Sequence, residues 1–295
     1  MDRSAVLNRA AWDRQATLLL PADRPSRPGR LEWTQYPGHG PGIDLLGDVS
    51  GRTVVEVGCG SADNLAALAA AGGHCTGIDL SPAQLERAAV RWGQQTMSLL
   101  CGDARTLLAE QPTAFDICVS IFGAIGHCPP EQLLPVITDA LRPGGLLAFS
   151  VAHPRWLDAG HSHLLLADGT RVPVTRWTAT PTGWIAAAQA AGLHVRTAIE
   201  IETPDGSGPC CLIVLAERPG STTLASAPSS TAGRPAVVSP VPAAGRTGCP
   251  NRRTLPRARQ PWPGPSRYPY DVTRRQPTTP RTPLSQIVRP EGPTW

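Results

Sequence analysis

The chain has 295 residues, enough for one large domain or two small ones, and its apolar fraction of 41% is ordinary for a globular protein. No apolar run reaches the length of a membrane-spanning helix, and the polar N-terminus "MDRSAVLNRAAWDRQ" has no signal-peptide core. These features argue against a membrane partner and predict a cytoplasmic enzyme or binding protein.

A change of composition near Arg218 separates two regions of different charge. Residues 219–295 are rich in Pro, Ser, Thr and Arg, and they hold eleven arginines but only two acids. The rest of the chain holds sixteen arginines and twenty-one acids. Such a segment cannot bury enough apolar surface to offset its chain entropy, so we expect a disordered tail. It is either a binding segment for an acidic or proline-recognising partner or an appendage without a specific role; its partner is unknown.

Apolar runs of strand length alternate with helix-like segments in the rest of the chain. The expected strands cover 53–58, 74–80, 97–103, 115–123, 146–153, 194–202 and 210–218. The expected helices cover 62–73, 81–93, 130–141 and 181–192. In the second of these helices, Ser81 is placed as N-cap, Pro82 follows it, and Gln84 completes a capping box. The alternation predicts an α/β domain with a parallel sheet and helices on both faces, whose ligand binds at the carboxyl ends of the strands.

The first strand ends in "EVGCGSA", where Gly58 and Gly60 permit a tight turn and a close approach of the backbone to a ligand. Dinucleotide sites share this turn, so the glycines alone do not identify the ligand. Glu56 discriminates, because its carboxylate repels a pyrophosphate at the helix start and suits a cation or hydroxyl groups. The alternative is that Glu56 is solvated or paired with an arginine. Ala62 stands where a third glycine is often found.

The next two strands also end in acids. Asp79 lies 21 residues after Gly58, which suits hydrogen bonds to two ribose hydroxyls; the alternative is that it only helps to cap the following helix. Asp103 can accept a hydrogen bond from an exocyclic amine, and the Ala104 amide can donate to a ring nitrogen. Together with Glu56, these groups predict a pocket for a nucleoside that carries a positive charge and no phosphate.

The segments "VVEVGCGSADN", "GIDLS", "GDA" and "LRPGGLLAFS" together resemble the class I S-adenosylmethionine-dependent methyltransferases, over roughly residues 45–217. Within that family the chain is similar to bacterial small-molecule enzymes with "HP" after the fifth strand. The resemblance implies a doubly wound, Rossmann-like sheet of seven strands, mostly parallel with the last strand antiparallel. It implies S-adenosylmethionine as cofactor and places its contacts on Glu56, Gly58, Cys59, Gly60, Asp79, Leu80, Asp103, Ala104 and Ser120.

The sequence identifies the methyl acceptor less clearly than it identifies the cofactor. His127 and His153 follow the fourth and fifth strands, so either can act as a general base, although a loop histidine can equally pack or bind water. "SIFG" replaces the pattern of amino-methylating nucleic-acid enzymes, and no basic aromatic patch lies in the folded part, which argues against nucleic acid and favours a small-molecule acceptor. "HSH" at 161–163 lacks further ligands at zinc spacing, so no metal is expected.

These features divide the chain into an N-terminal lid or helical segment (1–45), a methyltransferase domain (46–218) and the tail (219–295). Residues 154–181 are expected to form an acceptor-binding insertion. Three other functions remain open. A nicotinamide-dependent oxidoreductase is opposed by Glu56. A cofactor-binding regulatory protein without catalysis and an RNA methyltransferase anchored by the basic tail are harder to exclude.

Overall fold

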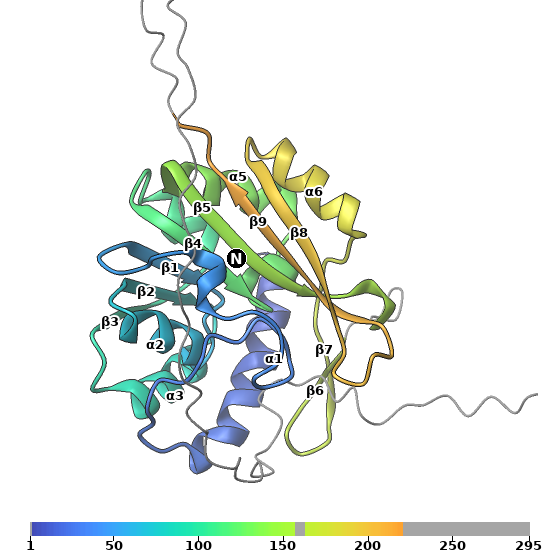
Figure 1. Cartoon of the computed structure of the whole chain (residues 1–295). Coiled ribbons are helices and arrows are strands. Elements are labelled where there is room, and N and C mark those ends of the chain that lie inside the picture. The colour runs from blue at the N-terminus through green and yellow to red at the C-terminus, as the bar shows by residue number, and fades with distance from the viewer. Residues whose placement is uncertain (1, 157–162, 221–295) are drawn as a thin grey trace, which may run out of the picture.

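A computed structural model describes residues 2–156 and 163–220, and it contains one sheet of seven strands (Figure 1). The strand order is β3-β2-β1-β4-β5-β9-β8. The strands are β1 (Thr53–Val57), β2 (His74–Asp79), β3 (Met97–Cys101), β4 (Phe115–Ile121), β5 (Leu141–Ala152), β8 (His194–Glu202) and β9 (Pro209–Glu217). β1 to β5 pair in parallel, and β9 lies antiparallel between β5 and β8. The predicted α/β fold, with its antiparallel last strand, is confirmed.

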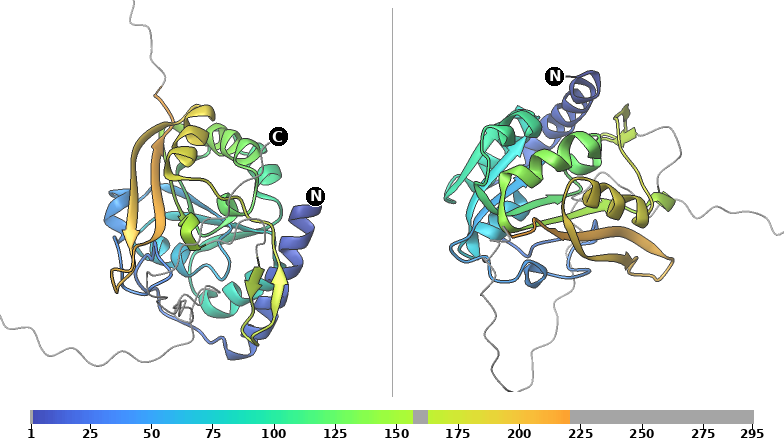
Figure 2. Two further views of the ribbon diagram at one scale, coloured as in Figure 1. Left: turned by 90° about the vertical axis from the view of Figure 1, so that its right-hand side faces the viewer. Right: turned by 90° about the horizontal axis from the view of Figure 1, so that it is seen from above.

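Helices cover both faces of the sheet (Figures 1 and 2). They are α1 (Arg3–Leu19), α2 (Asp63–Ala70), α3 (Pro82–Trp92), α4 (Ala104–Ala109), α5 (Pro130–Ala140) and α6 (Pro181–Ala190). The core on one face contains side chains of α2 and α3, and the core on the other contains side chains of α4, α5 and α6. Short 3-10 helices cover Leu20–Ala22, Ile43–Leu46, Ala124–Gly126 and Pro154–Trp156. None of the described helices is long and apolar enough to cross a membrane.

The insertion between β5 and α6 contains a small hairpin of β6 (His163–Leu165) and β7 (Arg171–Pro173). Its apolar side chains pack on α1 rather than on the large sheet, because Leu164, Leu166 and Val174 share a small core with Ala11. The hairpin and α1 are therefore neighbours, although they are far apart in sequence.

The N-terminal segment has two different parts. α1 stands apart from the sheet, whereas the stretch from Leu31 to Leu46 enters the core. Leu31 and Trp33 are both buried, and they pack with Cys210 and Cys211 of β9. The second part is thus integral to the domain, and only α1 has the position of a cover.

Two local predictions differ from the structure. β5 begins at Leu141, five residues before the expected start, because Phe115 pairs with Leu141 before a bulge restores the register. The capping box is half formed: Ser81 Oγ accepts from the Gln84 amide, but the Ser81 amide donates to Asp79. Gln84 is therefore free to accept from Arg87.

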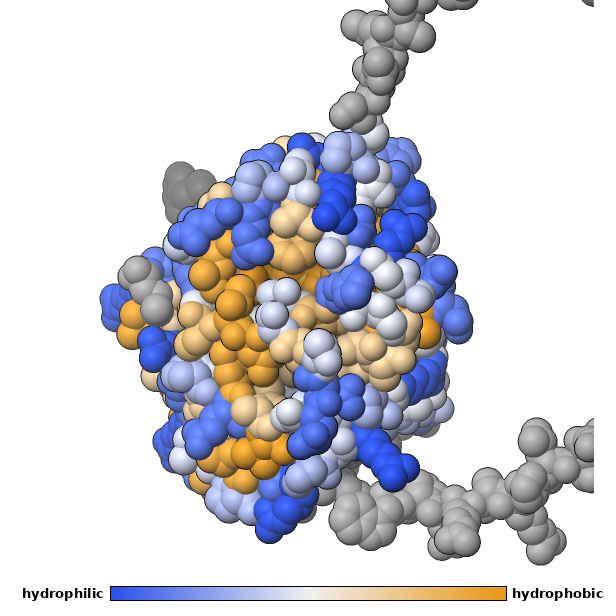
Figure 3. Space-filling model, turned by 90° about the vertical axis from the view of Figure 1, so that its left-hand side faces the viewer, coloured by the Kyte–Doolittle hydropathy of each residue, from blue (hydrophilic) through white to orange (hydrophobic). Residues whose placement is uncertain are grey.

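Apolar side chains gather on the face of the molecule where β3 forms the edge of the sheet (Figure 3).

The tail predicted over 219–295 lies outside the described residues apart from Pro219 and Gly220.

Candidate cofactor and acceptor pocket

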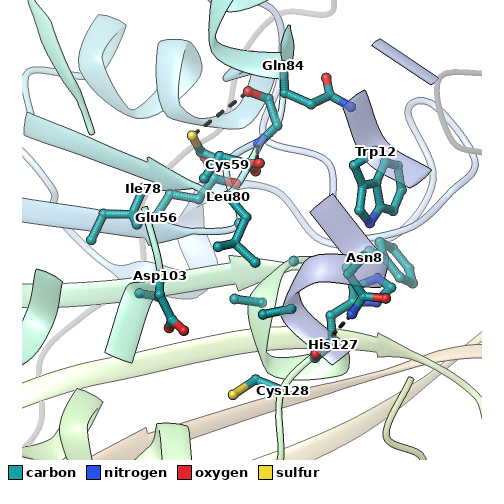
Figure 4. Close-up of a pocket in the computed structure, with 18 of the residues that line it drawn as sticks. Asn8, Trp12, Glu56, Cys59, Ile78, Leu80, Gln84, Asp103, His127 and Cys128 are labelled. Atoms are coloured by element: carbon teal, nitrogen blue, oxygen red, sulfur yellow. Dashed lines mark hydrogen bonds between the residues drawn. The ribbon is translucent and has the colours of Figure 1, made fainter. Parts of the chain in front are cut away.

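One pocket lies at the carboxyl ends of β1 to β4 and is covered by α1 (Figure 4). Eight of the nine predicted cofactor contacts line it: Glu56, Gly58, Cys59, Gly60, Asp79, Leu80, Asp103 and Ala104. Trp12 and Asn8 of α1 lie with His127 on the opposite side from Glu56 and Asp103. The described residues contain no group of three or more His, Cys, Asp or Glu side chains that could hold a metal ion.

The loop after β1 is built from left-handed residues. Gly58 has φ of 75° and Gly60 of 53°, and the Gly58 and Cys59 amides donate to the Ile78 carbonyl. This pairing holds the loop against the end of β2. Ala62 has φ of 57° and is fully buried at the start of α2. The position therefore requires a small side chain and has a backbone conformation that glycine adopts most easily.

Glu56 is 2% exposed, which rules out the solvated alternative considered from the sequence. Its Oε2 has no hydrogen-bond partner among the described residues. Burial raises the pKa of Glu56 well above its ordinary value, and the charges of Asp63 and Asp79 raise it further. A buried acceptor without a donor is costly, so this side of the pocket favours a ligand that brings a cation or a hydroxyl donor.

Asp79 links the glycine loop to the start of α3. Its two oxygens accept from the Gly60 amide at 2.8 Å and from the Ser81 amide at 2.9 Å. Burial raises its pKa to about 6, although both hydrogen bonds act in the opposite direction. Since each carboxylate oxygen can accept a second bond, Asp79 retains acceptor capacity for ligand hydroxyls. The helix-capping alternative and a ligand-binding role are therefore compatible.

Asp103 is held by Arg105. It accepts from the Arg105 amide at 2.9 Å and lies 2.6 Å from the guanidinium. Burial alone would raise the pKa of Asp103, but the hydrogen bonds from Arg105 bring it below its ordinary value. Asp103 is therefore an ionised acceptor at neutral pH.

Ser120 does not line the pocket. Its hydroxyl donates to the Val57 carbonyl at 3.0 Å and accepts from the Ile125 amide at 3.3 Å, and the residue is fully buried. The next two residues, Ile121 and Phe122, line the pocket instead. This placement does not support a cofactor contact at Ser120, because the hydroxyl fixes the loop after β4 to β1.

The two histidines have different environments. His127 lines the pocket, and its Nδ1 lies 3.0 Å from the Thr175 carbonyl. A carbonyl oxygen only accepts, so Nδ1 carries the proton and Nε2 is the acceptor. Burial, followed by the charge of Arg176, lowers the pKa of His127 to about 4, so the ring is neutral at pH 7. The His127 and Trp12 rings are nearly perpendicular, with centroids 5.7 Å apart.

His153 is not among the residues that line this pocket. Its Nε2 lies 2.8 Å from a carboxylate oxygen of Glu200 on β8, and its Nδ1 accepts from the Arg155 amide. Both ring nitrogens are thus occupied at the β8 side of the sheet. The structure does not bring His153 to the candidate site, contrary to its predicted place in the catalytic set.

Sequence reasoning missed the specific residues that α1 contributes. Asn8, Trp12 and Gln15 line the pocket, and Asn8 is 2% exposed. Its amide donates to the carbonyls of His127 and Thr175 and accepts from the Thr175 amide. The available signals were an Asp2 N-cap and a face of residues at helical spacing from Ala5 onward.

Comparisons with known proteins agree with this geometry. Residues 54–145 match the model of a family described as "Methyltransferase domain". The Ubiquinone biosynthesis O-methyltransferase of Idiomarina loihiensis is 35% identical over 104 residues, which cover 34% of this chain and 42% of that protein. The protein of the same name from Bordetella avium is 30% identical over 154 residues, covering 51% and 59%. The chain thus spans about half the length of the curated relatives it matches.

A solved structure from Listeria monocytogenes, described as a putative S-adenosylmethionine dependent methyltransferase, has the same fold. Its TM-score is 0.51 at 20% identity, and the match covers 59% of this chain and 94% of that chain.

Proposed function

We propose that this chain, which belongs to the class I S-adenosylmethionine-dependent methyltransferase family, transfers the methyl group of S-adenosylmethionine to a small organic acceptor. The observation that carries the proposal is the buried Glu56 carboxylate, whose Oε2 lacks a partner among the described residues and which lies in the same pocket as Asp79.

The residues of the pocket fit this cofactor. Glu56 would accept from the ammonium group of the methionine moiety, and Asp79 would accept from the ribose hydroxyls. Asp103 and the Ala104 amide would hold the adenine. Gly60 lines the pocket, and a Cβ there would meet nothing closer than Gln84 Oε1 at 4.0 Å, so the glycine leaves room beside the loop.

The carboxylates around the glycine loop disfavour the binding of a dinucleotide. Glu56 is flanked by Asp63 and Asp79, which already raise its pKa. A pyrophosphate at the start of α2 would add negative charge to this cluster, and in a buried environment that repulsion is large. We therefore favour the methyltransferase function over the nicotinamide-dependent oxidoreductase.

When bound, the cofactor supplies a methyl group that its sulfonium already activates. The chain must then orient an acceptor atom in line with that group and exclude water. Trp12, Phe122 and Leu133 line the pocket with apolar surface suited to that purpose. Neutral His127 presents Nε2 as an acceptor for a substrate O–H or N–H. Because the pKa of His127 is about 4, its ring is suited to orient the substrate O–H or N–H but is a weak base for taking up the proton.

The charges that line the pocket favour a small molecule over RNA. Its lining includes the carboxylates Asp2, Glu56, Asp63, Asp79 and Asp103, against Arg87 and Arg105. A nucleic-acid substrate is normally held by arginines and lysines that neutralise its phosphates. The names of the two relatives, which refer to O-methylation in ubiquinone biosynthesis, further support a small acceptor.

The test is incubation of the full chain with cell extract and a radiolabelled methyl donor, followed by separation of small molecules, protein and RNA. We expect label in the small-molecule fraction, and less of it with the Asp79→Ala variant at a limiting concentration of the donor. Label in RNA would favour the RNA methyltransferase alternative. Binding of S-adenosylhomocysteine without any transfer would favour the regulatory protein.

A further inference from the structure

A hydrogen-bonded chain connects α1 to the cofactor loop. Asp13 of α1 accepts from the Ser81 hydroxyl at 2.6 Å. The Ser81 amide donates to one oxygen of Asp79 at 2.9 Å, and the other oxygen of Asp79 accepts from the Gly60 amide at 2.8 Å. One residue, Ser81, thus stands between the covering helix and the carboxylate assigned to the ribose.

The hydrogen-bonding groups of the Ser81 side chain are both in use, so the connection between α1 and Asp79 has little freedom to rearrange. Ser81 is fully buried, and its hydroxyl donates to Asp13 while accepting from the Gln84 amide. Asp13 Oδ1 also lies 3.4 Å from the Ala83 amide, at the N-terminus of α3, where a negative charge is stabilised. Removing Asp13 would leave the Ser81 hydroxyl without its acceptor in a buried environment.

A second set of polar contacts connects the start of α1 to another acid of the pocket. Asp2, the N-cap of α1, lies 3.0 Å from the Arg105 guanidinium, which lies 2.6 Å from Asp103. Both acids assigned to the nucleoside are therefore one residue away from an acid of α1. These two connections, which share no residue, indicate that the position of α1 and the orientation of the cofactor acids are linked.

We propose that Asp13 is a positioning residue for the cofactor, and that the docking of α1 and the binding of the cofactor stabilise each other through Ser81 and Asp79. This inference rests on the proposed function, because it takes the pocket to bind S-adenosylmethionine. Coupling between two sites is reciprocal: if docked α1 strengthens cofactor binding by some factor, the cofactor strengthens docking by the same factor.

α1 also holds the residues on the side of the pocket where His127 lies. Asn8 bonds the Thr175 backbone and the His127 carbonyl, and Gln15 accepts from the Ala167 amide. Undocking of α1 would therefore also loosen the segment that contains Thr175 and Ala167.

The test compares the full chain with its Asp13→Ala and Asp13→Asn variants. Glu86→Ala is the matched control, because Glu86 is an exposed acid on α3. Affinity for S-adenosylhomocysteine is measured by calorimetry, and the docking of α1 by hydrogen exchange of residues 3–19 with and without that ligand. We expect Asp13→Ala to lower the affinity about fivefold to thirtyfold and to abolish the ligand-dependent protection of α1.

Asp13→Asn keeps an acceptor oxygen for Ser81, so we expect a smaller loss of affinity than in Asp13→Ala, and it replaces Asp13→Ala if that variant does not fold. Glu86→Ala should behave as the unmodified chain. Unchanged affinity and unchanged protection in both Asp13 variants would overturn the inference while leaving the proposed function intact. An unmodified chain that does not bind S-adenosylhomocysteine would overturn both. A purely structural role is excluded if the protection by ligand, and not only thermal stability, is lost.

Discussion

The backbones of Gly58 and Gly123 are in direct contact. A Cβ on Gly58 would lie 2.7 Å from the Cα of Gly123 and 2.3 Å from the Ala124 nitrogen, and one on Gly123 would lie 2.4 Å from the Val57 carbonyl oxygen. The loop after β1 and the loop after β4 can approach this closely only because both residues lack a side chain. This contact sets the floor of the pocket.

Gly58→Ala is expected to destabilise the domain far more than Gly60→Ala. At Gly58, left-handed strain of about 1–2 kcal/mol adds to a backbone clash costing about 1–3 kcal/mol. At Gly60 the backbone is also left-handed, but the nearest atom to a new Cβ is 4.0 Å away, so only the strain remains. Urea unfolding of both variants measures the difference. Equal losses of unfolding free energy would show that the two loops can separate freely.

Asp79→Ala is expected to weaken binding of S-adenosylhomocysteine by about 1.5–3 kcal/mol, the loss typical of hydrogen bonds to a charged acceptor. Calorimetry measures it, with Asp48→Ala as control, because Asp48 is an exposed acid outside the pocket. Thermal unfolding of the variant separates lost binding from lost folding. If affinity is unchanged in a folded variant, Asp79 does not hold the ribose.

Cofactor affinity is expected to rise with pH between pH 5 and pH 7. Asp79 has a pKa of about 6, raised by burial, so it is protonated below that pH. Ribose hydroxyls and an ammonium group bind ionised carboxylates better, so binding must release protons, and affinity changes by up to about tenfold per pH unit for each proton released. The heat of binding should then depend on the ionisation enthalpy of the buffer. In Asp79→Asn the part of this dependence centred near pH 6 should disappear; affinity that is independent of pH would contradict the prediction.

His127→Ala is expected to slow methyl transfer by up to about a hundredfold, the loss typical of a misoriented reacting group, with near-normal affinity for S-adenosylhomocysteine. His153→Ala should leave turnover close to that of the unmodified chain, because its ring binds Glu200 rather than the pocket. Single-turnover rates with labelled donor measure both. The reverse order of effects would return the catalytic role to His153.

The seven-stranded, mostly parallel sheet with its antiparallel last strand could be predicted from the sequence, and so could the acids at the strand ends, because local patterns determine them. An apolar strand, a glycine turn and a capped helix follow one another in the sequence, and each acid lies at or near the carboxyl end of its strand. Glu56 and Asp79 lie within the last two residues of β1 and β2, and Asp103 follows the end of β3 by two residues. The place of Ser120 could not be predicted from the sequence, because its hydroxyl bonds the Val57 carbonyl and the Ile125 amide, which belong to two different segments.

The contacts of α1 and the environment of His153 could not be predicted in this way. Asp13 meets Ser81 across 68 residues, and Asn8 meets Thr175 across 167. Such pairs depend on how distant elements pack, and no local pattern encodes them. His153 similarly follows its strand as expected, but it turns to Glu200 on β8 rather than to the ligand edge.

The central claim is that the pocket binds S-adenosylmethionine rather than a dinucleotide. It is tested most directly by calorimetric titration of the full chain with S-adenosylhomocysteine and, separately, with NAD. We predict saturable binding of one S-adenosylhomocysteine per chain and no heat with NAD. Saturable binding of NAD with no response to S-adenosylhomocysteine would contradict the claim.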